Sequence, residues 1–249
     1  MSQPMPGFWK VLKKSLADSY DYLGLILLSS AAWFIVVLGG LTVTVKLGFY
    51  RNPLPFLASL ALFFVVLIAP LTAAVHHLAK KIVTRDDPSL MDLLRGFVEF
   101  LVPSWKLGFL QGLITLVILG NAWFYLTRGV LILQVLGILF IYLTFVWAFS
   151  LIYHYPLLIE QRSGPWKTVK RAFLLALDNV VFTAQVFFAI ILLTCFSAVT
   201  LVGMLLIFAG TSSILATRAL RALFVRYEIL EPEREPAEDE QPWPADTKG

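Results

Sequence analysis

Long uncharged runs separated by short charged segments are the main pattern along this chain. The runs cover residues 22–45, 52–79, 107–127, 129–159 and 179–217. About 20 apolar residues form a helix that crosses the roughly 30 Å hydrocarbon core of a bilayer, so each of the first four runs predicts one span. The last run has 39 residues and would be roughly 58 Å long as one helix at about 1.5 Å per residue. It therefore predicts two spans with a turn near Gly203, and one span plus a re-entrant segment stays open as the alternative.

The composition agrees with this pattern. The chain is 59% hydrophobic and 14% charged, whereas soluble domains carry about 25% charged residues. We therefore predict an all-α membrane protein with six transmembrane helices. Pro70 is expected to kink the second span, which a membrane helix tolerates when a neighbour bonds the carbonyl that the proline leaves free.

A short basic amphipathic helix, here called an elbow helix, is predicted before each pair of spans. The first covers residues 7–20 and is typical of helices that lie at the membrane surface. Its apolar side is predicted to carry Phe8, Val11, Leu12 and Leu16. The second is expected to begin with an acidic N-cap at Asp86 or Asp87 followed by Pro88, and to end at Pro103 and Ser104.

The first and third elbow helices match at a constant offset of 157 residues. The matching pairs are Gly7 with Gly164, Trp9 with Trp166, Lys10 with Lys167, Lys13 with Lys170, Lys14 with Arg171 and Asp21 with Asp178. The middle copy is more diverged, with Asp92 and Arg95 at two basic positions and Pro103 at the acidic one. Three repeats of elbow helix plus helical hairpin are therefore predicted within one membrane domain, at about residues 7–82, 86–162 and 164–227.

The basic residues predict the orientation. In a six-span topology with the N-terminus inside, fifteen Lys and Arg residues lie on the inner side and three on the outer side, namely Lys46, Arg51 and Arg128. This asymmetry places both termini in the cytoplasm. Residues 228–249 are rich in Glu, Asp and Pro and predict a disordered acidic cytoplasmic tail. Because the basic residues cluster beside apolar runs, the expected partners are the lipid bilayer and anionic lipids at the elbow helices, with no nucleic acid.

Several stretches resemble the YesL-like family of bacterial integral membrane proteins, a family of unknown function. They are residues 69–81 (APLTAAVHHLAKK), 87–100 (DPSLMDLLRGFVEF), 105–125, 155–179 (YPLLIEQRSGPWKTVKRAFLLALDN) and 218–227. The resemblance implies a place in the bacterial cytoplasmic membrane and a helper role beside the membrane subunits of carbohydrate uptake systems. It carries over no catalytic or binding residue. The acidic tail after Tyr227 departs from the usual short ending of the family.

The ionisable candidates are three histidines and two aspartates. His76, His77 and His154 lie near the inner ends of two spans, where they could approach a metal ion. Adjacent helical residues point about 100° apart, which favours histidines at the membrane interface over a metal site. Asp21 and Asp178 stand where spans one and five begin, and N-terminal acids interact favourably with a helix dipole. We therefore expect Asp21 and Asp178 to cap these helices.

The polar side chains inside the spans are neutral. The amides are Gln111, Asn121, Gln134 and Gln185, which we interpret as interhelical hydrogen-bonding groups worth about 0.6 kcal/mol each. Gly108 and Gly112 form a G-x-x-x-G pattern that favours close helix packing. The sequence contains no phosphate loop, nucleophile elbow or zinc-protease helix, so neither an enzyme nor a cofactor is predicted.

Three functions remain open from the sequence. The first is a non-enzymatic accessory or scaffolding protein that assists carbohydrate uptake. The second is a small-solute transporter or channel in its own right, for which the neutral polar residues could line a path. The third is a lipid- or stress-responsive membrane element, suggested by the basic elbow helices.

Overall fold

The structure is a computed structural model that describes residues 7–46, 53–200 and 202–231, and every regular element in these ranges is a helix. The elements in chain order are α1 (Phe8–Asp21), α2 (Leu23–Lys46), α3 (Pro53–Phe63), the π-helix η2 (Phe64–Ile68), α4 (Ala69–Thr84), α5 (Leu90–Glu99), α6 (Leu101–Leu126), α7 (Leu131–Gln161), α8 (Pro165–Asp178), α9 (Val180–Thr200), the π-helix η3 (Met204–Phe208) and α10 (Ala209–Arg226). The turn predicted between the first two spans, over residues 46–55, falls largely on residues 47–52. Those residues and the acidic tail beyond residue 231 lie outside the described residues.

Six helices in the described ranges are long and apolar enough to cross a membrane, which confirms the predicted multi-pass class. They are Leu23–Lys46, Leu54–Thr84, Leu101–Leu126, Leu131–Gln161, Val180–Thr200 and Met204–Arg226. The last uncharged run thus forms two candidate spans rather than one. The turn is predicted near Gly203, but Gly203 is already helical with φ −62°. Helix α9 ends at Thr200, and residue 201 lies outside the described residues.

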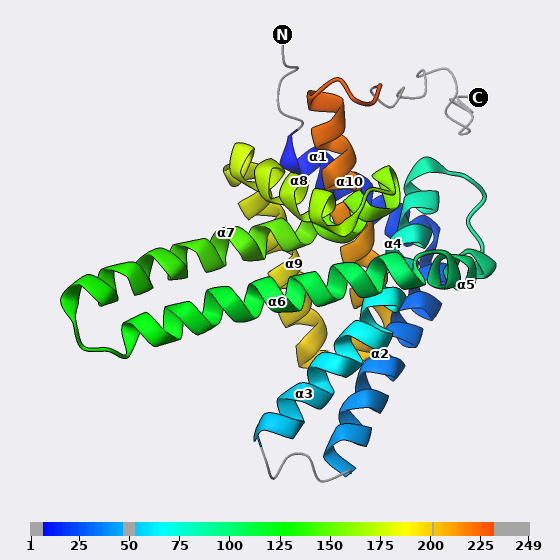
Figure 1. The fold of residues 1–249 in the computed structure, drawn as a ribbon. Helices are drawn as coiled ribbons and strands as arrows, with labels where there is room; N and C mark the ends of the chain where they lie inside the picture. Colours follow the sequence, from blue (N-terminus) through cyan, green and yellow to red (C-terminus); the bar gives the residue numbers. More distant parts are fainter. Residues whose placement is uncertain (1–6, 47–52, 201, 232–249) are drawn as a thin grey trace, which may run out of the picture.

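Helices α4, α7 and α10 contact one another and form the centre of the protein. Figure 1 shows α10 passing between the other elements, and 61% of its most apolar stretch is buried against at most 28% in any other described span. Small residues allow this close approach. A Cβ added at Gly210, for example, would lie 2.8 Å from Ile26 Cγ2 of α2.

Each elbow helix packs on one of the three central helices: α1 on α10, α5 on α4 and α8 on α7. The buried face of α1 differs from the predicted apolar side, since Leu16 is 53% exposed while Ser15 and Asp18 are buried. Small serine side chains let α1 lie close to α10, and Asp18 finds a charged partner there. The apolar face of α1 is therefore only partly its packing face.

The second elbow helix begins and ends at residues other than those predicted. Its N-cap is Ser89, whose side chain and backbone form a capping box with Asp92, so the prediction of Asp86 or Asp87 as the cap is wrong. The helix ends at Glu99, and Pro103 lies in the first turn of α6 instead of breaking α5. Proline is tolerated there because the first N–H groups of a helix lack intrahelical partners in any case.

Pro70 interrupts the regular hydrogen bonding of the second span, as predicted. It is the second residue of α4, just after η2, and it lacks the N–H that would bond the Val66 carbonyl in an α-helix. The indole Nε1 of Trp105 in α6 donates to that carbonyl oxygen at 3.0 Å. A neighbouring helix therefore supplies the hydrogen bond that the proline removes.

The hairpins leave the centre in different directions. Figure 1 shows the α6–α7 hairpin extending away from the hairpin of α2 with α3. Their far ends carry exposed apolar side chains, such as Leu54 at 80% and Leu131 at 77% exposure. In a chain with apolar spans of this length, we interpret these surfaces as lipid-facing.

The two glycines of the G-x-x-x-G pattern provide a matched test of packing. A Cβ at Gly108 would lie 2.9 Å from the Ala69 Cβ, whereas a Cβ at Gly112 would meet nothing within 4 Å. We expect Gly108→Leu to lower the free energy of unfolding by about 1–3 kcal/mol through overpacking. The control Gly112→Leu gains the same helix propensity without a clash, so its free energy of unfolding should equal or exceed that of the unsubstituted protein. Unfolding in mixed micelles measures the free energy of unfolding of both variants. Equal changes in that energy for the two substitutions would contradict this packing.

Candidate functional site at the packed ends of the central helices

Glu160 joins the three central helices at one end. Its carboxylate lies near the end of α7, where Oε2 is 2.9 Å from Lys80 Nζ of α4 and Oε1 is 3.0 Å from Arg221 Nη1 of α10. The Glu160 side chain is only 11% exposed. We call the ends of α4, α7 and α10 that carry Lys80, Glu160, Arg218 and Arg221 the hub.

A second ion pair attaches α1 to the hub. Arg218 of α10 donates through Nε to Asp18 Oδ2, and both side chains are less than a tenth exposed. The partners are 200 residues apart in sequence, so this pair links the first elbow helix to the last span. A charge taken out of water costs several kcal/mol unless it is paired, which makes each partner dependent on the other.

Asp92 fixes the second elbow helix against α4. Its Oδ1 lies 2.8 Å from Lys81 Nζ, and its Oδ2 accepts from the Ser89 backbone N–H and hydroxyl, each at 2.9 Å. Burial raises the pKa of the Asp92 carboxyl, but the hydrogen bonds from Lys81 and Ser89 outweigh this effect and lower the pKa to about 2. Asp92 is therefore ionised at neutral pH and acts at once as helix cap and interhelical ion-pair partner.

A buried network of neutral polar groups lies between α6 and α7. The Gln111 amide nitrogen is 2.8 Å from His154 Nδ1, and the Tyr155 hydroxyl donates to Gln111 Oε1 at 3.4 Å. The Ser150 hydroxyl lies 3.5 Å from His154 Nε2. The ring of His76 in α4 stacks on Tyr155 with centroids 5.8 Å apart. The network therefore brings together Gln111, His154 and His76 from three different spans.

His77 points to a different neighbour from His76. Its Nδ1 is 3.1 Å from the Asp92 backbone oxygen and its ring lies beside Phe100, so it packs against α5. His76 instead faces α7. Within the part of the chain that the structure describes, no three His, Cys, Asp or Glu side chains form a group that could hold a metal ion.

The remaining predicted residues lie apart from the hub and from the buried network. Asp21 and Asp178 are exposed and form the last residues of α1 and α8, so they end the elbow helices. At the junction after α8 the neighbouring Asn179 is buried instead, where it bonds the Tyr227 hydroxyl at 3.0 Å and also binds Arg226. The expectation that Asp21 and Asp178 cap the following spans is therefore wrong.

The four amides behave differently from one another. Gln111 makes the interhelical contact predicted for it, whereas the Asn121 side chain donates to Val117 of its own helix at 2.7 Å. Gln134 is half-buried and Gln185 is exposed, and neither side chain has a hydrogen-bond partner among the described residues. Only packing distinguishes these residues, because all four are uncharged polar groups in apolar runs.

Sequence reasoning missed Asp18 and Glu160, the two acids that hold the hub together. One signal in the sequence indicates such partners: Arg218 and Arg221 are three residues apart and so share a face of one helix, where two cations call for acidic partners. Asp18 precedes Asp21 by less than one turn, but the 157-residue offset between the elbow helices pairs Asp21, and not Asp18, with an acidic residue. The buried acid has no acidic counterpart in α8, where Leu175 occupies the matching position.

Chemically, the arrangement consists of ion pairs and neutral hydrogen bonds that fix helices relative to one another. No family model, curated protein or solved structure matches this chain. The hub and the buried network are therefore described from the chain's own geometry.

The pair of Asp18 and Arg218 gives a test with an internal control. Asp18→Asn removes the carboxylate charge that pairs with the buried guanidinium of Arg218, and we expect a loss of about 3 kcal/mol in the free energy of unfolding. Asp21→Asn removes the same charge from the exposed end of the same helix and should change that energy by less than about 0.5 kcal/mol. Denaturant titration in mixed micelles compares the two, and a larger loss for Asp21→Asn would contradict the assignment.

Proposed function

We propose that this chain is a non-enzymatic accessory or scaffolding protein of the bacterial cytoplasmic membrane, that it belongs to the YesL-like family, and that it assists a carbohydrate uptake system. The observation that carries the proposal is the use of charge in the hub. Glu160 is bonded to Lys80 and Arg221, and Asp18 to Arg218. Because these acids pair with cations of other helices, their charges fix the helices relative to one another. This suits a structural role better than the binding of a transported solute.

We further propose that the membrane domain consists of three repeats arranged in a closed ring. The helices α1 and α8 both have 14 residues and end at the aspartates paired by the 157-residue offset. The N-caps of the three elbow helices, Gly7, Ser89 and Gly164, occupy matching positions. Each elbow helix also packs on the second helix of another hairpin, with α1 on α10 linking the first repeat to the third.

The proposed orientation places the hub and both termini in the cytoplasm. Its support is the excess of Lys and Arg at this end of the spans. A phosphatase reporter that is active only in the periplasm should be active when fused behind Arg128 and inactive when fused behind Arg226. A green fluorescent reporter at the same two positions provides the complementary control. Activity behind Arg226 would contradict an even number of spans between the termini.

The accessory role and the alternative of a transporter differ in solute flux. We expect radiolabelled maltose and glucose to enter liposomes containing only this protein at the rate of protein-free liposomes, while uptake of a labelled carbohydrate by cells lacking the chain is slower. Co-flotation of protein with lipid verifies insertion, and a pore-forming peptide verifies that the vesicles report flux. Saturable entry into the protein-containing liposomes would replace the accessory proposal by the transporter.

A further inference from the structure

Two adjoining cavities meet at Lys106, at the start of α6. The first has a volume of about 300 Å³ and is lined by Glu99, Phe100, Lys106, Arg162 and Gly164, among others. The second has a volume of about 400 Å³ and is lined by Val65, Val66, Trp105, Lys106 and Phe109. We propose that together they bind one anionic phospholipid, with its phosphate in the first cavity and part of an acyl chain in the second.

The first cavity carries an excess of positive charge. Arg162 pairs with Glu99 at 2.6 Å, whereas Lys106 has no ion-pair partner in the portion of the chain that the structure describes. Two cations and one carboxylate therefore line this cavity. Gly164 and Pro165 place the N-terminus of the 14-residue helix α8 on the same wall, and the dipole of that helix adds partial positive charge. Lys106 is the cation left available for a phosphate.

The second cavity is apolar and has a fixed wall. Besides Lys106, its lining residues are two valines, Trp105 and Phe109. The Trp105 ring is held by the hydrogen bond from its Nε1 to the Val66 carbonyl oxygen at 3.0 Å, so the groove between η2 and α6 keeps its form. An acyl chain would exchange lipid neighbours for these side chains, which changes its environment little. Preference among lipids therefore depends on the headgroup.

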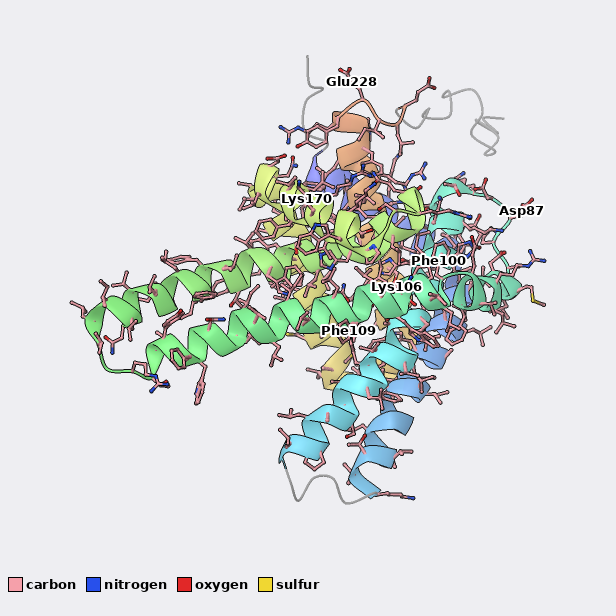
Figure 2. The ribbon with its side chains drawn as sticks, viewed as in Figure 1. Asp87, Phe100, Lys106, Phe109, Lys170 and Glu228 are labelled. Atoms are coloured by element: carbon pink, nitrogen blue, oxygen red, sulfur yellow. The ribbon has the colours of Figure 1, made fainter. Side chains whose placement is uncertain are left out.

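The position of Lys106 fits the depth of a lipid phosphate. It lies in the second turn of the candidate span Leu101–Leu126, and Lys side chains near the ends of spans reach the headgroup region. Figure 2 shows Phe100, Lys106 and Phe109 following one another along the start of α6. In the orientation proposed above this end faces the cytoplasmic leaflet, where anionic lipids are enriched. Binding itself does not depend on that orientation.

The lipid site can be separated from general attraction between basic helices and an acidic membrane. Lys106→Gln and Lys170→Gln each remove one exposed positive charge. Lys170 lies on the elbow helix α8 and lines neither cavity, and Figure 2 shows it apart from Lys106. The full chain is placed in nanodiscs of phosphatidylcholine with increasing phosphatidylglycerol. Native mass spectrometry then counts the phosphatidylglycerol molecules retained, and a fluorescent phosphatidylglycerol gives the affinity.

We expect the unsubstituted protein to retain phosphatidylglycerol in preference to phosphatidylcholine. Lys106→Gln should weaken this binding about tenfold, the equivalent of one charge-assisted hydrogen bond. Lys106→Arg should keep the affinity within about twofold, because it keeps the charge, and Lys170→Gln should leave it unchanged. The thermal unfolding of Lys106→Gln serves as a check of folding, and an unchanged midpoint is expected for an exposed side chain.

Three results would overturn the proposal. The first is equal retention of both lipids by the unsubstituted protein. The second is equal weakening by Lys106→Gln and Lys170→Gln, which indicates diffuse attraction without a site. The third is complete displacement of the lipid by millimolar inorganic phosphate, which assigns the first cavity to a soluble anion. None of these results bears on the flux measurements, so the lipid site and the accessory function can fail separately.

Discussion

The need to pair buried charge governs how the helices meet at one end of this protein. A buried carboxylate such as Glu160 is costly unless cations pair with it. Glu160 has two such partners, one on α4 and one on α10. This requirement fixes the relative height of three helices that come from three different hairpins. The pair of Asp18 and Arg218 then places α1. The hairpins are thus held together at the hub, while Figure 1 shows that they separate away from it.

The spans could be predicted from the sequence because the bilayer imposes their length. The uncharged runs and the described candidate spans agree within a few residues at most of their ends. The position of α10 at the centre could not be predicted. The span that contains α10 is the least apolar of the six described spans, and low hydropathy by itself indicates only a less certain membrane span. Its small and hydroxylated residues face other helices instead of lipid, a fact that only packing reveals.

The contacts of the candidate site could be predicted only where the type of a residue indicates the kind of hydrogen-bond partner that it needs. Gln111 was expected to bond across helices and does, but nothing in the sequence distinguishes it from Gln185, which is exposed. Asp18 and Arg218 lie 200 residues apart, and local patterns carry no information on such a pair. At the second elbow helix the prediction named Asp86 or Asp87 as the cap, but the helix begins after Ser89, which forms a capping box with Asp92.

The hydrogen bond between Trp105 and Val66 ties together two positions that are distant in the chain. Proline at 70 has no N–H to donate to the Val66 carbonyl, and of the apolar aromatic side chains only an indole brings both a large ring and an N–H donor to it. If residue 70 regained an N–H, that demand on residue 105 would disappear. In homologous chains the two positions should therefore change together. Their co-variation would reflect a missing backbone N–H in one helix and a side-chain donor from another helix that replaces it.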